Sequence, residues 1–308
     1  MVAEIEKRVV PCESGPDEGV GARWRPAGFL LALPSLAVFV GAGFIPLALI
    51  ATWSFWSFDP DTYWIRPAWS FASYAALLEN GRAAVFLRTA GLAALTATAS
   101  TLLAVPAATV VGLLSGPRRA ALLLALFTIP FFTSGLVRAF AWRLVLGRQG
   151  IINNALMSLG VVETPVEWLV FSDFAVLLGM VAAYLPFAIV PIVLAFARIE
   201  RSVIRASQDL GAGFWTVLAT IVLPLVLPGI VAGFLFVFVV AVGTSMEIQL
   251  LGGAGASSIS IMIDDVLRVL NFPLAFAIAT VVITLFTVLI IIANRALRLS
   301  HLFESLGI

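Results

Sequence analysis

Two short groups of polar side chains interrupt an otherwise apolar chain, and their types suit the binding of a charged solute. The first group is Thr128, Thr133, Ser134 and Arg138, and the second is Thr244, Ser245, Glu247 and Gln249. An ionisable side chain in apolar surroundings is costly, so by default it indicates a functional site. The hydroxyls, the amide and the two charges could hold a solute by hydrogen bonds and ion pairs. A carboxylate such as Glu247 would attract a cation.

Each of these side chains also has a structural interpretation. Arg138 could extend its guanidinium to the outer membrane interface. The threonines and serines could hydrogen-bond between packed helices. Glu247 could pair with Arg138 or with Arg268. Both interpretations remain open at this point.

Three residue types are nearly absent, and this excludes several kinds of site. Cys12 is the only cysteine, His301 the only histidine and Lys7 the only lysine. No intrachain disulfide, cysteine metal cluster or histidine relay can therefore form. A phosphate-binding Walker loop needs a lysine after a glycine-rich turn, which VAEIEKRVV around Lys7 does not provide. No clustered catalytic residues are present, so we expect no enzyme activity and no bound cofactor or metal.

The composition places the chain in a membrane. Hydrophobic residues make up 61% of the 308 residues, charged residues 11%, and the mean hydropathy is +1.09. Soluble domains contain about 45–50% apolar and about 25% charged residues. The net charge of +1 also lacks the concentrated basic face that nucleic acid requires. We therefore expect an all-α integral membrane protein with membrane lipid, and no nucleic acid, around it.

Six uncharged runs are long enough to cross about 30 Å of hydrocarbon. They are Gly28–Ile50, Thr89–Leu114, Ala120–Val137, Phe174–Ala197, Phe214–Met246 and Val269–Asn294. The first is too long for a cleaved signal peptide, so we interpret it as a retained span. The fifth exceeds what a membrane needs, and its start (Phe214 to Ile221) is expected outside the lipid.

The basic residues predict the orientation of these spans. An even number of spans puts both termini on one side, together with 11 of the 18 Lys and Arg residues. The short loop Gly116–Arg119 and the tail after Asn294 count most in the positive-inside rule. We therefore predict a multi-pass protein of a bacterial inner membrane with both termini in the cytoplasm.

The remaining segments complete the predicted domain organisation. Residues 1–25 form a disordered cytoplasmic tail, 26–299 the six-helix domain and 300–308 a second cytoplasmic tail. On the outer side, Ser70–Asn80 and Ile151–Gly160 place apolar residues at helical spacing. These two segments are expected to be short helices along the membrane surface.

A loop at about residues 199–221 breaks the apolar pattern with charges and two glycines. Ser202 to Leu210 predicts a short helix with Val203, Ser207 and Leu210 on one face. Gly211 then stands where helices end in a left-handed residue, and Phe214 begins a second helix. Pro224 and Pro228 follow inside the next span, where they bend it. The result would be a small helical projection fixed to a kinked span, suited to a groove on another protein. An ordinary amphipathic connector is the alternative.

This loop resembles the cytoplasmic signature loop of ABC importer permeases. The matching pattern is Ala206-x-x-Asp209-Leu210-Gly211-Ala212, then Ile221-x-Leu223-Pro224 and Pro228-Gly229-Ile230. Similarity to the spermidine/putrescine branch, in its first-permease type, continues through Pro130–Trp142, Gly150–Pro165, Tyr184–Ile192 and Leu250–Gly253. It covers most of the chain after residue 25.

The resemblance implies a transport subunit that receives energy through a contact. It implies a type I importer fold, an ABC ATPase dimer that carries ATP and Mg²⁺, a second permease that usually differs from the first, and a periplasmic or extracellular solute-binding protein. The ATPase-coupling residues would be Arg205, Ala206, Asp209, Leu210, Gly211, Ala212, Ile221 and Pro224. Family members usually carry glutamate where this chain has Arg205, so Glu200 or Asp209 would replace it, or the ATPase surface differs.

The resemblance also implies a polyamine (spermidine or putrescine) or a related small amine as the solute. Polyamine permeases are expected to carry an acid near Gln249, which is an amide here. Either Glu247 takes over that role, or the solute carries less positive charge than spermidine. The alternatives are import of another small organic solute (an opine, an amino-acid-like compound or a phosphonate) and a proton-coupled secondary transporter. A secondary transporter would need more intramembrane acids or histidines than Glu247.

Overall fold

The computed structural model describes the backbone of residues 26–305, and the side chains of residues 33–297 except residue 201. The prediction for residues 1–25 and the side chains of Lys7, Cys12 and His301 lie outside these residues. The chain divides into two units, Met1–Leu49 and Ile50–Ile308. The first unit contains most of α1 (Pro26–Trp53), an apolar helix long enough to span a membrane.

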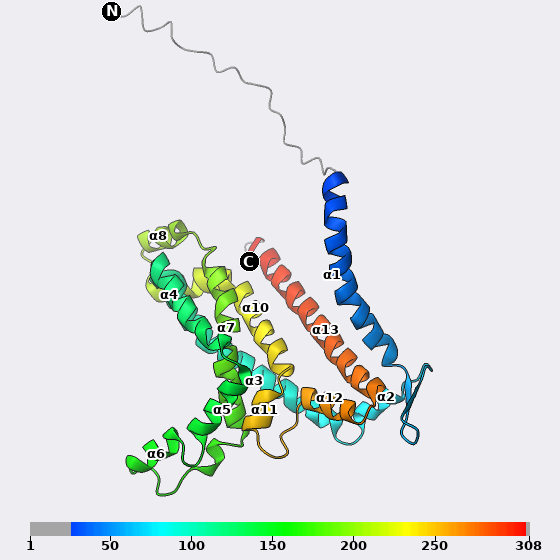
Figure 1. The fold of residues 1–308 in the computed structure, drawn as a ribbon. Coiled ribbons are helices and arrows are strands. Elements are labelled where there is room, and N and C mark those ends of the chain that lie inside the picture. Colours follow the sequence, from blue (N-terminus) through cyan, green and yellow to red (C-terminus); the bar gives the residue numbers. More distant parts are fainter. Residues whose placement is uncertain (1–25, 306–308) are drawn as a thin grey trace, which may run out of the picture. The chain divides into compact units, whose positions relative to one another are not determined.

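The second unit is almost entirely helical (Figure 1). Its regular elements are β1 (Ser57–Asp59), β2 (Trp64–Arg66), α2 (Ala72–Ala75), α3 (Arg82–Thr109), α4 (Pro117–Thr128), α5 (Gly135–Leu146), α6 (Ile151–Ser158), α7 (Asp173–Phe196), α8 (Arg201–Asp209), α9 (Phe214–Val217), α10 (Leu223–Val242), α11 (Met246–Leu251), α12 (Ile259–Arg268) and α13 (Phe272–Ser305). Three 3-10 turns, η1 (Ala76–Leu78), η3 (Ile129–Phe132) and η4 (Glu167–Leu169), and two π-helical turns, η2 (Val110–Leu114) and η5 (Leu218–Val222), complete it.

Most of the predicted spans are confirmed as long apolar helices. Five helical stretches of the described residues are long and apolar enough to cross a membrane: Leu33–Trp53, Arg82–Leu114, Glu167–Phe196, Phe214–Val242 and Phe272–Leu297. The last begins three residues later than predicted, because Leu270 adopts a left-handed φ of 60° after α12.

The predicted third span over Ala120–Val137 is not one continuous helix. The helix breaks after Phe132, and the segments Pro117–Phe132 and Gly135–Ser158 meet at 91°. Pro130 lacks an N–H donor, and Thr133 and Ser134 both have extended ψ angles near 135°. The bent pair brings the number of candidate spans to six when it is counted as one.

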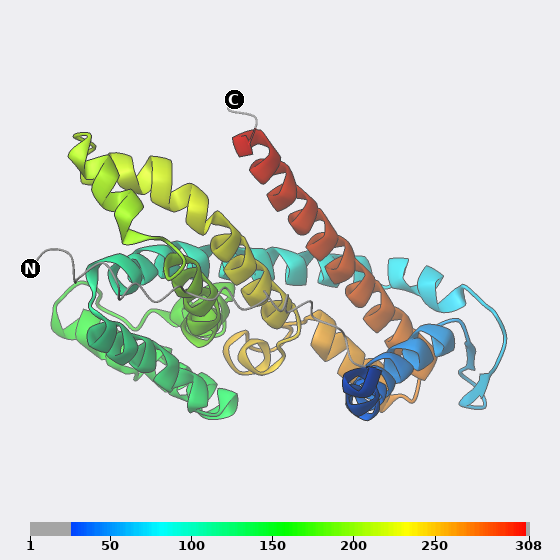
Figure 2. The ribbon, with the colours of Figure 1, turned by 90° about the horizontal axis from the view of Figure 1, so that it is seen from above.

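The core is a three-helix packing of α3, α7 and α10, and Figure 2 shows α3 running across α10. Small side chains let the backbones approach closely. A Cβ built on Gly229 of α10 would stand 2.5 Å from the Cβ of Ala195, and one on Gly233 would stand 2.9 Å from the carbonyl oxygen of Ala188. Glycines four residues apart are a common device for close helix packing in membranes. α3 contributes a matching buried stripe of alanines, among them Ala93, Ala97 and Ala104.

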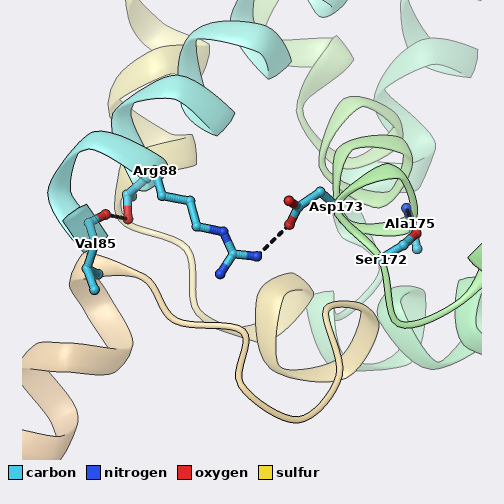
Figure 3. A network of polar contacts seen from close by, with 6 residues as sticks. Val85, Arg88, Ser172, Asp173 and Ala175 are labelled. Atoms are coloured by element: carbon cyan, nitrogen blue, oxygen red, sulfur yellow. Dashed lines mark hydrogen bonds and ion pairs between the residues drawn. The ribbon is translucent and has the colours of Figure 1, made fainter. Parts of the chain in front are cut away.

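An ion pair and a helix cap fix one end of this core (Figure 3). Arg88 of α3 donates a 2.6 Å hydrogen bond to Asp173 in the first turn of α7. The hydroxyl of Ser172 caps the same helix by accepting from the N–H of Ala175 at 3.1 Å. Because both charged side chains are largely exposed, the ion pair adds little stability, and the cap sets where α7 begins.

Proline explains one of the two π-helical turns. Pro224 cannot donate a backbone hydrogen bond and crowds the carbonyl of Thr220, one turn earlier. The wider π-helical turn η5 lies directly before it. Pro224 and Pro228 were predicted to bend this span, and the structure shows a local widening of the helix before Pro224.

The connections between spans contain one element that the sequence analysis missed. The two predicted surface helices are present, as α2 with η1 (Ala72–Leu78) and as α6. An antiparallel hairpin of β1 and β2 was not predicted, although its Pro60–Asp61 turn between aromatic residues is a hairpin signal. Hydrogen bonds from the Thr62 side chain and the Asp61 N–H hold the pKa of Asp59 below its usual value.

Candidate solute pathway and coupling loop

The charged loop after α7 is a short helix closed by a glycine turn. α8 ends at Asp209, and Gly211 follows with a left-handed φ of 86°, as the sequence predicted. The N–H of Ala212 donates to the carbonyl of Ser207 at 3.1 Å, and the N–H of Gly211 donates to Gln208 at 2.9 Å. This pair of bonds is a Schellman motif, which satisfies the free carbonyls at the helix end. Its geometry reverses the chain at Gly211.

The predicted coupling residues lie mainly on the outside of this turn. Arg205, Ala206, Asp209 and Gly211 are exposed, and Leu210 at the tip is 89% exposed. Ala212 and Ile221 are partly buried, and Pro224 on α10 is exposed. Val203, Ser207 and Leu210, which were predicted to share a face, differ in exposure: Val203 and Leu210 are exposed, and Ser207 is buried. Ser207 is buried beside the partly buried Ile204, because Ile204 and Ser207 are three residues apart and face the same side of α8.

A cavity of about 250 Å³ lies directly behind the loop. It is lined by Leu113 and Leu114 of η2, by Leu218 and Val222 of η5, and by Ile204, Arg205, Gln208, Phe214 and Val217. Both π-helical turns of the described chain therefore meet at the base of α8.

The second candidate region is the corner in the third span. Arg138, one turn into α5, reaches back across the break, and its Nη1 donates to the carbonyl of Pro130 at 3.0 Å. A longer contact of 3.4 Å joins the same nitrogen to the carbonyl of Thr133. The guanidinium is a second donor to the Pro130 carbonyl, which also accepts from the Thr133 N–H at 3.3 Å. Arg138 bridges the 91° corner.

Glu247 of α11 is buried next to this corner. Its side chain is 5% exposed, and the Arg138 Nη2 lies 3.7 Å from its Oε1. The hydroxyl of Thr244 donates to its Oε2. The buried Tyr184 of α7 interacts with the side chains of both Thr244 and Glu247. A carboxylate, a hydroxyl, a phenol and a guanidinium thus converge from three helices and the turn that precedes α11.

The structure brings together some of the predicted pathway residues and separates others. Arg138, Thr244 and Glu247 form one cluster, and Thr133 joins it through its carbonyl. Ser134, Ser245 and Gln249 make no side-chain hydrogen bond to this cluster in the described part of the chain, and Gln249 is exposed. Thr128 donates to Leu124 of its own helix. Tyr184 was missed, although a lone tyrosine in an apolar span is a polar group at membrane depth.

Phenylalanines from α7, η3 and α10 adjoin this cluster. The ring of Phe187 lies 6.3 Å from Tyr184, 5.0 Å from Phe131 and 4.9 Å from Phe236. Phe131 and Phe236 are each about half exposed, at 46% and 49%. Aromatic faces attract ammonium and guanidinium groups.

Comparison with curated proteins identifies relatives over most of the chain. The spermidine/putrescine transport system permease protein PotB of Salmonella typhimurium (strain SL1344) is 31% identical over 257 residues, which cover 83% of this chain and 88% of PotB. PotB of Escherichia coli (strain K12) is 30% identical, with 83% and 92% covered. The inner membrane ABC transporter permease protein YdcU of the same strain is 28% identical over 298 residues, which cover 92% of this chain and 95% of YdcU.

Solved structures agree on the fold. A chain in the crystal structure of a bacterial alginate ABC transporter, in complex with alginate pentasaccharide-bound periplasmic protein, superposes with a TM-score of 0.70 at 18% identity, covering 87% of this chain and 93% of that one. A second structure of an alginate importer gives 0.69. No protein-family model matches the chain. On the strength of the PotB relatives and this shared architecture, the chain belongs to the family of ABC transporter permeases that includes PotB.

Proposed function

We propose that this chain imports a polyamine, such as spermidine or putrescine, or a related small amine, as one permease of an ATP-driven importer. Membership of the permease family makes it a transport protein and not an enzyme. The observation that carries the choice of an amine is Glu247, a carboxylate buried at the end of a span beside Thr244 and Tyr184. The names of the PotB relatives support the same solute class.

Energy would enter through α8 and its glycine turn. The exposed Leu210 and the neighbouring Asp209 form the tip of a compact projection, which fits a groove on another subunit. Glu200 and Asp209 stand at opposite ends of α8, and Asp209 is the acid beside the tip. We therefore assign to Asp209 the ion pair that Arg205 cannot make. In this proposal the chain binds no cofactor, and ATP and Mg²⁺ belong to the partner ATPase.

The proposed assembly has two permeases, two ATPase subunits and a solute-binding protein on the outer side. The half-exposed Phe131 and Phe236 would face the second permease or the solute path. Both termini and α8 would lie in the cytoplasm, and α6 and the β1–β2 hairpin outside. Figure 1 supports the opposite placement of α8 and α6, because they lie at opposite ends of the second unit.

Uptake of radiolabelled putrescine and spermidine by cells that express the whole system tests the solute. Glu247→Gln keeps the shape and hydrogen bonding of the side chain but removes its charge. Loss of a charge-assisted interaction in a desolvated site costs about 1–3 kcal/mol, so uptake per permease should fall about ten-fold or more. Asp264→Asn, at an exposed carboxylate on α12, is the matched control and should leave uptake unchanged. Equal uptake of putrescine and spermidine by Glu247→Gln and wild type would contradict the proposal that the solute is an amine.

An amino-acid-like solute is the second candidate, and Arg138 is the observation that favours it. A zwitterion would place its ammonium at Glu247 and its carboxylate at Arg138, because the two opposite charges are neighbours in the structure. In that case Arg138→Gln would weaken solute binding. For an amine, the same substitution has the opposite effect, as argued next.

A further inference from the structure

The ion pair of Arg138 and Glu247 is the most buried one among the described residues. Its side chains are 16% and 5% exposed, whereas each of the other three described pairs has at least one side chain that is more than 60% exposed. A bare carboxylate at such depth is costly, so a positive charge nearby stabilises the ionised form of Glu247. Two cations could supply it: the guanidinium of Arg138 or the ammonium of a bound amine.

The contact between the two side chains is loose. At 3.7 Å, Arg138 Nη2 and Glu247 Oε1 lie well beyond the roughly 2.7–2.9 Å of a charge-assisted hydrogen bond. The hydrogen bonds of the guanidinium go instead to the carbonyls of Pro130 and Thr133, and its buried Nε has no partner. Arg138 is therefore held by the corner of the third span and supplies Glu247 with charge only.

Thr244, Tyr184 and Arg138 surround the carboxylate of Glu247, and Arg138, at 3.7 Å from Oε1, is the partner that a better donor would replace. Thr244 occupies Oε2, and it can keep that bond while an ammonium donates to Oε1. Arg138 can withdraw and retain its carbonyl bonds on the other side of its guanidinium. α11 packs against both α5 and α7, so a small shift between α5 and α11 changes the separation of the two charges.

We infer that Arg138 is a tethered counter-ion that occupies the carboxylate of Glu247 when no solute is bound and is displaced by the ammonium group of the amine. This inference rests on the proposed function, since it requires a cationic solute. The exchange keeps Glu247 neutralised in both states. It also makes the amine compete with a permanently attached cation, which weakens binding and favours release toward the cytoplasm. Arg138 acts here as a residue that sets affinity.

Equilibrium binding to the purified complex separates this role from a structural one. The complex of this chain with its partner permease and ATPase is placed in nanodiscs, and binding of radiolabelled spermidine is measured without binding protein. Arg138→Gln removes the competitor, so the Kd should fall about ten-fold. Arg138→Gln combined with Glu247→Gln should lose this gain. Arg143→Gln is the matched control on the same helix, since Arg143 lies over the ring of Phe171 and should leave the Kd unchanged.

A second measurement applies if Arg138→Gln is not recovered from the membrane. Arg138→Ala is purified with millimolar methylguanidinium, which can fill the vacated space. Methylguanidinium should then inhibit spermidine binding competitively in Arg138→Ala and have no effect in wild type. Equal sensitivity in both proteins would overturn the inference.

The outcomes distinguish the inference from the function beneath it. One outcome is that the Kd for spermidine in Arg138→Gln is unchanged or higher while the wild type takes up amine and Glu247→Gln does not. That result would overturn the role of Arg138 as a counter-ion and would leave the proposed function intact. A higher Kd specifically for zwitterions points to the amino-acid-like solute. Wild-type cells that take up no amine would overturn both.

Discussion

Gly229 of α10 and Ala195 of α7 touch so closely that a single added carbon would not fit between them. A Cβ on Gly229 would stand 2.5 Å from the Cβ of Ala195 and 2.9 Å from the carbonyl oxygen of Pro191. Both neighbours are fixed, one as a backbone atom and the other as a side chain without rotamers. The contact therefore sets the distance between two of the three core helices.

Gly229→Ala should destabilise the permease by forcing α7 and α10 apart. Overpacking of this kind costs about 1–3 kcal/mol, and the melting temperature of the protein in detergent should fall by several degrees. Gly91→Ala is the matched control, because nothing lies within 4 Å of the Cβ position at Gly91 on α3. If both variants melt at the wild-type temperature, the close contact is not a determinant of stability.

Asn153 should hold together the segment that follows α5. The side chain is fully buried, donates to the carbonyls of Gly147 and Val166, and accepts from the Val166 N–H at 2.7 Å. Asn153→Ala removes the acceptor of the Val166 N–H, at a cost of about 1–3 kcal/mol, whereas the Gly147 carbonyl keeps the bond that it accepts from the Gly150 N–H. Hydrogen exchange of residues 147–170, followed by mass spectrometry, should accelerate.

The neighbouring Asn154 provides the control for this experiment. It is exposed and makes one side-chain bond, to the carbonyl of Gln149. Asn154→Ala should exchange as the wild type does. Similar acceleration in both variants would mean that the effect comes from α6 in general and not from the buried amide.

Gly211→Val should uncouple transport while leaving insertion intact. The φ of 86° is costly for a β-branched residue, so the turn after α8 would change its direction. The ATPase should co-purify poorly, or lose solute-stimulated hydrolysis, at normal permease abundance. Gly211→Asn is the control, since asparagine tolerates the left-handed conformation better than other residues. Wild-type uptake by Gly211→Val would remove the coupling role of this loop.

Single cysteines test the orientation of the chain. In a Cys12→Ser background, cysteines at Gly116 and Gln208 should resist a membrane-impermeant thiol reagent in intact cells. A cysteine at Val161, which is 65% exposed, should react. All three should react in permeabilised cells. Labelling of Gln208 from outside would reverse the predicted topology and place α8 away from any cytoplasmic ATPase.

Structural features that depend on residues nearby in the sequence, or on the surrounding membrane, could be predicted from the sequence. Apolar runs such as Phe214–Val242 predict membrane spans directly, because hydropathy measures the transfer of side chains from water to an apolar medium. The end of α8 at Gly211 follows from the conformational freedom of one residue and its place after a short helix. The widened turn before Pro224 follows from a missing N–H donor. Each of these has a cause within a few residues of its effect.

Only the tertiary structure decided how these parts meet. Proline at position 130 allowed a break in the third span, but its 91° angle depends on the carbonyls that Arg138 binds and on the helices around it. The sequence offered both Arg138 and Arg268 as partners of Glu247, and the packing of α11 against α5 selected Arg138. Gly229 could be seen as a family motif residue, whereas its contact with Ala195 required the crossing of α7 and α10. These contacts join residues that are far apart in the chain. Local sequence propensity does not predict them, because they stabilise the protein only after the helices have packed.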